Sequence, residues 1–229
     1  FGIPFIIILP LYLSKSQDLV ALAQGLVGKG NNYLFLPAGI SLGTFLGALA
    51  YSGAGGNLNL AQSFYIRDKG YGMGHYADKI TNIRSTKNIS LSGTTFPLTP
   101  ANLLNFKKWW RLVNQEHLIV FWALGLLTML ALGLLAFVTA GESNNNQEGL
   151  NFLFNQASAI SQRTLPIIGS AFLGITGLML LSTQFGILDS TSRVISENTH
   201  LLKKKPGNLS KTYFIALWLQ IFFGIMVFS

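Results

Sequence analysis

The chain has 229 residues, of which 50% are hydrophobic and 10% are charged, and its net charge is +8. Soluble globular domains carry about a quarter charged residues, so this composition argues against that class. The sequence contains no cysteine, which excludes disulfides and thiolate metal sites within it.

Five apolar segments without charge predict membrane-spanning helices, because such a run of about 18 or more residues is typical of a span. They are residues 1–13, 33–66, 118–141, 165–187 and 212–229. The first and last are short for a bilayer, and we interpret them as partial spans of a longer polytopic protein. The sequence therefore predicts an all-α transmembrane helical bundle, with residues 1–229 forming one transmembrane domain fragment.

Most Lys and Arg residues lie in segments 67–117 and 188–211. The positive-inside rule places both segments in the cytoplasm and predicts a multi-pass protein of the cell inner membrane. We expect segment 14–27 to form a short amphipathic helix on the outer surface, and residues 143–149, within the outer segment 142–164, to be a solvated loop. Because topology accounts for the basic charge, we expect membrane lipid as a partner, and neither nucleic acid nor an obligate protein partner.

Segment 33–66 is too long for a single span. At about 1.5 Å per residue a straight helix would measure roughly 50 Å, against a hydrocarbon core of about 30 Å. Gly53, Gly55 and Gly56 lie near its middle, and each weakens a helix by about 1 kcal/mol relative to Ala. We predict two half-helices joined by an unwound link at about 52–57. A kinked helix packed closely through small residues is the alternative.

An unwound link at membrane depth favours a cation site, because its backbone must be buried in protein or line a wet cavity. Freed carbonyl groups at the end of the first half-helix would face the ion. The amides of Asn57, Asn59 and Gln62 would add neutral oxygens, which suit hard divalent cations. Gly53 and Gly56 complete this candidate transport path.

Two stretches of the sequence resemble a known family. GAGGNLNLAQSFYIRDKGYGMG at 53–74 and STQFGILDSTSRVISEN at 182–198 are similar to the prokaryotic branch of the Nramp family of divalent metal transporters and its divergent relatives. The resemblance covers nearly the whole chain. It implies the LeuT-type fold of two inverted five-helix repeats, with segment 33–66 as a broken sixth span.

The resemblance also implies metal ligands at the break, where typical members carry Met-Pro-His-Asn. The matching positions here are Ala54, Gly55, Gly56 and Asn57, so the implied metal positions are Ala54, Gly55 and Asn57. Loss of the Met thioether weakens the preference for soft transition metals over Mg²⁺. Loss of the His leaves coupling to protons open. The family's ligands on the first span would lie outside this sequence.

Ser182 and Thr183 are polar positions in the apolar segment 165–187. Symporters of the LeuT type use hydroxyl groups on the eighth span for a coupling ion, which makes both residues candidates. The alternative is that each hydroxyl bonds back to a carbonyl of its own helix.

Charged residues follow two of the predicted spans. Asp189 and Arg193 have the i, i+4 spacing of a surface ion pair, which is the simpler interpretation. The second interpretation is an inner gate that also includes Arg67 and Asp68, which directly follow segment 33–66. The simpler interpretation of Arg67 and Asp68 is that they are interfacial charges.

These features predict a secondary-active transporter that moves divalent cations of the Mn/Fe/Mg class by alternating access. The sequence shows no nucleophile–base pair and no paired acids typical of a catalytic pocket, so we expect neither an enzyme nor a bound cofactor. Two other functions remain open: a LeuT-type symporter for an organic substrate, and a non-transporting membrane scaffold or sensor that retains the fold.

Overall fold

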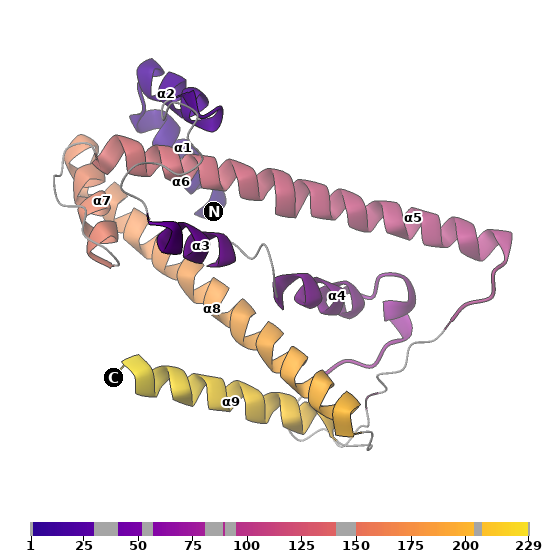
Figure 1. Ribbon diagram of the computed structural model, residues 1–229. Helices are drawn as coiled ribbons and strands as arrows, with labels where there is room; N and C mark the ends of the chain where they lie inside the picture. The colour runs from indigo at the N-terminus through magenta and orange to yellow at the C-terminus, as the bar shows by residue number, and fades with distance from the viewer. Residues whose placement is uncertain are drawn as a thin grey trace. The chain divides into compact units, whose positions relative to one another are not determined.

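The regular elements that the structure describes are all helical, which confirms the predicted all-α class (Figure 1). The chain divides into two compact units, unit 1 with Phe1–Leu42 and Glu116–Ser182, and unit 2 with Gly43–Gln115 and Thr183–Ser229. This computed structural model describes residues 2–29, 41–51, 57–80, 89, 95–140, 150–203 and 208–228.

Unit 1 is held together by helices that cross on apolar faces. Ile6, Leu135 and Ile160 are at most 1% exposed, and Phe172 packs with them in one core cluster. Lipid tails are as apolar as these side chains, so within a membrane the cluster is stabilised by close van der Waals packing. The helices are α1 (Gly2–Leu13), α2 (Ser16–Leu26), the π-helix η3 (His117–Ala123), α6 (Leu124–Ala140), α7 (Leu150–Arg163) and the first part of α8 (Pro166–Lys203).

Two of these helices, α2 and α7, lie in segments that the sequence places on the outer side of the membrane. Helix α2 confirms the helix expected within 14–27, and its first turn is capped by Asp18, whose carboxylate accepts a 2.7 Å bond from the backbone N–H of Lys15. Helix α7 lies in the outer segment 142–164, after the predicted loop at 143–149, which is outside the described residues. It forms because Gln156, Ala157 and Ile160 share one buried face, a helical pattern that the polar composition of this segment obscured.

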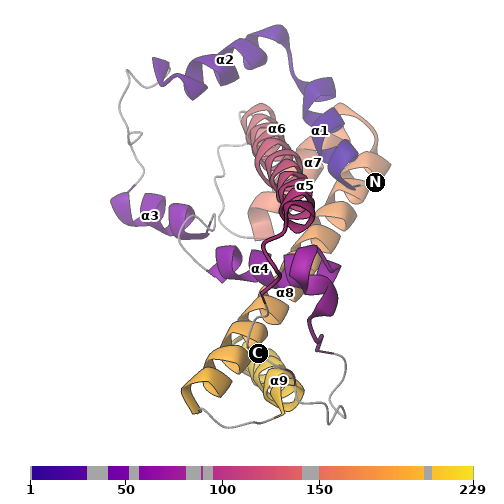
Figure 2. The ribbon, with the colours of Figure 1, turned by 90° about the vertical axis from the view of Figure 1, so that its right-hand side faces the viewer.

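Unit 2 contains α3 (Leu42–Tyr51), α4 (Asn57–Lys69), the 3₁₀-helix η2 (Gly72–Tyr76), α5 (Pro100–Glu116), the rest of α8, and α9 (Leu209–Phe228). Helix α9 runs beside the C-terminal part of α8 in both ribbon views (Figures 1 and 2). Ser192, Ser196 and Ser210 are fully buried in this unit. Small side chains of this kind allow membrane helices to approach closely.

The described residues include three helices that are long and apolar enough to cross a membrane, Pro100–Thr139, Pro166–Leu202 and Leu209–Val227. A fourth candidate is the pair α1 and α2, which is bent by 113°. The membrane character predicted from the sequence is therefore supported, at the level of apolar helices. Helix bounds differ from the predicted spans, because the helices continue through the charged residues that follow or precede each apolar run. Part of the predicted cytoplasmic segment 67–117 is accordingly helical.

The predicted break in segment 33–66 falls largely outside the described residues. Helix α3 ends at Tyr51 and helix α4 begins at Asn57. The positions between them, 52–56, are not described, and neither are positions 33–40. The unwound link and the LeuT-type arrangement therefore stay predictions.

Candidate functional site

The most highly connected polar contacts that the structure describes lie in unit 2, at the C-terminal end of α4. Arg67 suits that end because a cation there interacts favourably with the helix dipole. The carboxylate of Asp68 interacts unfavourably with the same dipole. Two cations compensate Asp68: Nη1 of Arg193 donates to its Oδ2 at 2.6 Å, and Nζ of Lys79 donates to its backbone carbonyl at 2.5 Å. The end of α4 is therefore fixed by contacts distant in sequence.

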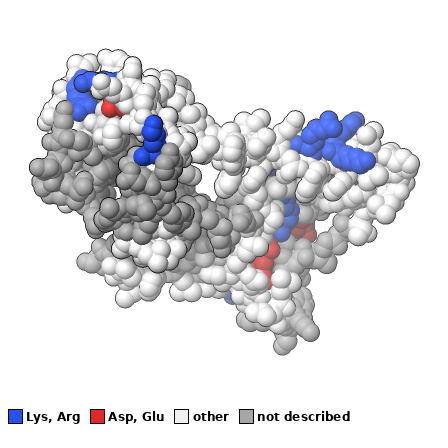
Figure 3. All heavy atoms as spheres, turned by 45° about the horizontal axis from the view of Figure 1, so that its top comes forward, with Lys and Arg blue, Asp and Glu red and all other residues white. Residues whose placement is uncertain are grey.

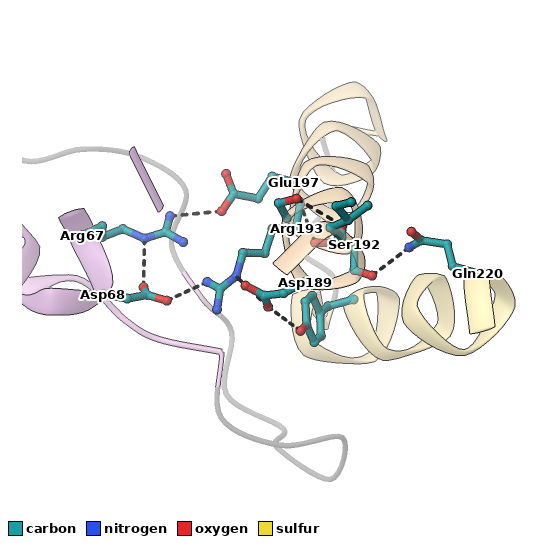
Figure 4. Close-up of polar contacts among 11 residues, drawn as sticks. Arg67, Asp68, Asp189, Ser192, Arg193, Glu197 and Gln220 are labelled. Atoms are coloured by element: carbon teal, nitrogen blue, oxygen red, sulfur yellow. Dashed lines mark hydrogen bonds and ion pairs between the residues drawn. The ribbon is translucent and has the colours of Figure 1, made fainter. Parts of the chain in front are cut away.

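Helix α8 supplies the other half of these contacts. Asp189, Arg193 and Glu197 follow each other at intervals of four residues, so they share one face of the helix. Nε of Arg193 lies 3.0 Å from both carboxylate oxygens of Asp189. Oε1 of Glu197 accepts a 3.0 Å bond from Nη1 of Arg67. Figure 4 shows the resulting chain of contacts, in which Arg67, Asp68, Asp189, Arg193 and Glu197 form what we call the charge network.

The charge network is largely shielded from solvent. The side chain of Arg193 is 13% exposed, that of Glu197 16% and that of Asp68 23%. Nε of Arg67 and Oδ1 of Asp68 lie 3.6 Å apart, and within the described residues neither atom has a hydrogen-bond partner. The network thus combines strong, charge-assisted bonds with one ion pair that is too long for a hydrogen bond.

Helix α9 contributes two further contacts to this face of α8. The hydroxyl of Tyr213 donates to Oδ1 of Asp189 at 2.6 Å, and the centroid of its ring lies 5.9 Å from Cζ of Arg193. Nε2 of Gln220 donates to Oγ of Ser192 at 2.9 Å. Tyr213 therefore holds Asp189 in the position from which it binds Arg193.

A glycine-rich turn packs beneath the end of α4. Gly72 has a φ of +57°, and a Cβ at this position would lie 2.9 Å from the indole of Trp109 on α5. A Cβ on Gly74 would lie 2.7 Å from the carbonyl oxygen of Arg67. Glycine is required at both positions for close approach, so GYGMG is a packing element that holds the backbone of Arg67.

A cleft of about 1000 Å³ opens beside the charge network in unit 2. Arg67 and Glu197 belong to both the network and the cleft wall, which Trp109 and Phe106 complete on the α5 side. No group of three His or acidic side chains suited to a metal occurs within the described part of the chain. The cleft therefore offers water and small solutes access to the charge network.

The structure brings together some of the predicted site residues. Arg67, Asp68, Asp189 and Arg193 are joined in one network, although their role as a gate is not tested by these contacts. Ser182 donates from Oγ to the carbonyl of Leu178 at 2.8 Å and is exposed, as in the alternative of bonding back to its own helix.

The other predicted residues take no part in the described contacts of the network. Thr183 is exposed and Gln62 is half-buried on α4. Asn57 and Asn59 lie in the first turn of α4, but their side chains are not described. Gly53, Ala54, Gly55 and Gly56 lie outside the described residues, so the metal site stays a prediction.

Sequence reasoning missed two members of the site, Glu197 and Tyr213. A signal existed for Glu197, which continues the four-residue spacing of Asp189 and Arg193. For Tyr213 there was none, because an aromatic residue near the start of an apolar helix is a common interfacial anchor.

In comparisons with protein-family models, curated proteins and solved structures, none matches this chain. The resemblance to the Nramp family rests on the two stretches of sequence at 53–74 and 182–198 alone.

Proposed function

We propose that the chain is part of a secondary-active transporter, of the Nramp-like LeuT type, that moves a divalent cation across the cell inner membrane by alternating access. The charge network closes its cytoplasmic end. The observation that carries this proposal is the bond between Asp68 on α4 and Arg193 on α8, which joins two apolar segments through shielded charges.

The charges of the network follow the apolar runs but are largely shielded from solvent, so each carries a desolvation cost that its partners must offset. If these contacts served only to hold two helices together, apolar packing would stabilise the pair of helices at least as well. The reason is that desolvation offsets most of the Coulombic attraction within a buried ion pair. Ion pairs have a different advantage: each partner can be solvated when the helices separate. Glu197 and Arg67 already line a cleft that would supply that water.

The length of α4 gives the separation between the charge network and the predicted cation site. Asn57 begins the helix and Arg67 lies near its end. At about 1.5 Å per residue the two positions are roughly 15 Å apart along the axis, about half of a hydrocarbon core. A cation held by Asn57 and the backbone carbonyl groups of Ala54 and Gly55 would lie near mid-membrane, with the charge network one half-helix below it.

The proposal is tested by uptake of Mn²⁺ and Mg²⁺ into proteoliposomes that contain the full-length protein. We expect saturable uptake of at least one ion, and at least a tenfold reduction in Asn57→Ala. Asn114→Ala is the matched control, because Asn114 is an exposed amide on α5 whose Nδ2 bonds only to the Trp110 carbonyl in the described contacts.

Two further outcomes separate the parts of the proposal. Absence of uptake of both ions by the unmodified protein would overturn divalent-cation transport. Unchanged uptake in Asn57→Ala would remove Asn57 from the site and leave transport standing. Repeating the assay with and without a pH gradient decides whether protons are coupled.

A further inference from the structure

The long helix that contains α5 and α6 is interrupted by a turn of another kind. Pro100–Thr139 is one helix of 40 residues, but His117–Ala123 within it is the π-helix η3. At the end of η3 the backbone N–H of Leu124 donates to the carbonyl of Ile119, five residues earlier, whereas an α-helix bonds four residues back. A π turn therefore holds one residue more than the α-helix on either side of it. Such turns are rare and are frequently found at functional sites.

Packing within the described part of the chain does not impose the π-helix. All seven residues of η3 are exposed there, and none is buried against another described helix. Two β-branched residues, Ile119 and Val120, lie at its centre, and residues of this type weaken an α-helix. A segment with few buried contacts is one where a structure opens at low cost in free energy.

The π-helix directly follows the point at which this long helix passes from one compact unit to the other. This part of unit 2 ends at Gln115 and unit 1 resumes at Glu116, one residue before η3. The uncharged run begins at Leu118, and Figure 3 shows basic side chains gathered over α5 with an uncharged surface next to them. The π turn therefore coincides both with the boundary between the units and with the start of the apolar run.

Helix α8 also passes from unit 1 to unit 2, and it too is weakened at its crossing. The boundary falls between Ser182 and Thr183. The hydroxyl of Ser182 donates to the carbonyl of Leu178, and back-bonding of this kind often bends a helix. Gly186 follows within about one turn, and a Cβ there would meet nothing within 4 Å. Close packing therefore does not account for this glycine, which weakens the helix.

We propose that η3 is a hinge about which the two units move relative to each other, with segment 182–186 of α8 bending at the second crossing. Helices kink at π turns, and a hinge is a short segment that absorbs the change in backbone angles. In lipid, a hinge must keep its backbone groups paired. A π turn meets this condition, because its N–H groups can exchange bonds five residues back for bonds four residues back. The hinge rests on the proposed function only for its purpose, which is to supply the motion that alternating access requires.

The test measures distances between paired spin labels in the full-length protein, in bilayers and in a background without other cysteines. Tyr12→Cys and Leu104→Cys place one label in each unit, at exposed positions. The reference pair is Leu104→Cys with Leu219→Cys, which lies within unit 2. We expect double electron–electron resonance to give a distance distribution at least about twofold wider for the pair between units than for the reference pair. A distribution no wider than the reference would overturn the proposal, whether or not the protein transports a cation.

Deletion of Val120 assigns the motion to η3, because it removes the extra residue and allows an unbroken α-helix with both flanks in register. We expect the distribution between units to narrow to the width of the reference pair. Val120→Ala is the matched control, since it shortens the same exposed side chain but keeps the number of residues, and it should leave the distribution wide. Equal widths in the two variants would show that η3 is not the hinge. An unchanged distribution for the reference pair establishes that the deletion variant is folded.

Discussion

Nη1 of Arg193 lies 2.6 Å from Oδ2 of Asp68, a residue 125 positions earlier in the chain. The same guanidinium holds Asp189 through Nε. Arg193 is therefore shared between a carboxylate on its own helix and one on α4. The Asp68 bond joins the two helices, whereas the Asp189 bond orients the guanidinium toward it.

The coupling between Asp68 and Arg193 is measurable in a double-mutant cycle. Asp68→Asn and Arg193→Gln should each lower the free energy of unfolding by about 1–3 kcal/mol, between the values for exposed pairs and for broken buried pairs. The two losses should not add, with an interaction energy of about 1 kcal/mol or more. Strictly additive losses in thermal or denaturant unfolding would show that the bond is not made.

Tyr213→Phe isolates the hydroxyl contact with Asp189, because the ring and its packing against Arg193 are kept. A hydrogen bond to a charged group contributes about 1.5–3 kcal/mol, so we expect a loss of this size in the free energy of unfolding. Tyr12→Phe is the control, since Tyr12 is 75% exposed, and it should be neutral. An equal effect of the two variants would contradict the positioning role of Tyr213.

Gly72→Ala should destabilise unit 2 for two reasons. The positive φ costs about 1–2 kcal/mol for a residue with a side chain, and the new Cβ would meet the indole of Trp109 at 2.9 Å. Adding Trp109→Leu should recover the part that is due to the clash. Gly25→Ala, where nothing lies within 4 Å of the added Cβ, should be neutral or slightly stabilising. A Gly72→Ala variant as stable as the unmodified protein would rule out this packing.

Gly169→Ala tests the packing of α7 on α8 in unit 1. A Cβ on Gly169 would overlap Oγ of Ser161 and lie 2.5 Å from the carbonyl oxygen of Ala157. We expect a loss of about 1–3 kcal/mol from this overpacking, seen as a lower unfolding midpoint. Gly174→Ala on the same helix meets nothing within 4 Å and should raise the midpoint or leave it unchanged. The opposite order of the two midpoints would contradict the described helix contact.

Uncharged runs predicted the all-helical class and the apolar helices. Burying a charge in lipid is costly, so membrane-spanning segments lack charged residues, and this absence is visible in the sequence. They did not predict the helix ends. Helix α8 continues from Pro166 to Lys203, through Asp189, Arg193 and Glu197, because spaced opposite charges support a helix outside an apolar environment. Helix α7 was missed for the related reason that its buried face includes the polar Gln156.

The pair Asp189 and Arg193 was predictable because its spacing is local. Its bond to Asp68 was not predicted, although these residues were assigned to one possible inner gate, since a single sequence carries no sign of a contact across 125 positions. The cation site at Ala54, Gly55 and Asn57 is still a prediction from glycine content and family resemblance. No described contact bears on its side chains.

The most direct test of gated alternating access is the rate at which a membrane-impermeant maleimide, added from the cytoplasmic side, labels Ser63→Cys in a background without other cysteines. Ser63 lies on α4 between the predicted cation site and the charge network, and it lines the cleft. We predict that Mn²⁺ changes this rate several-fold, and that Asp68→Asn fixes the rate at a high value with or without the ion. A rate that is the same in all four conditions would contradict the account.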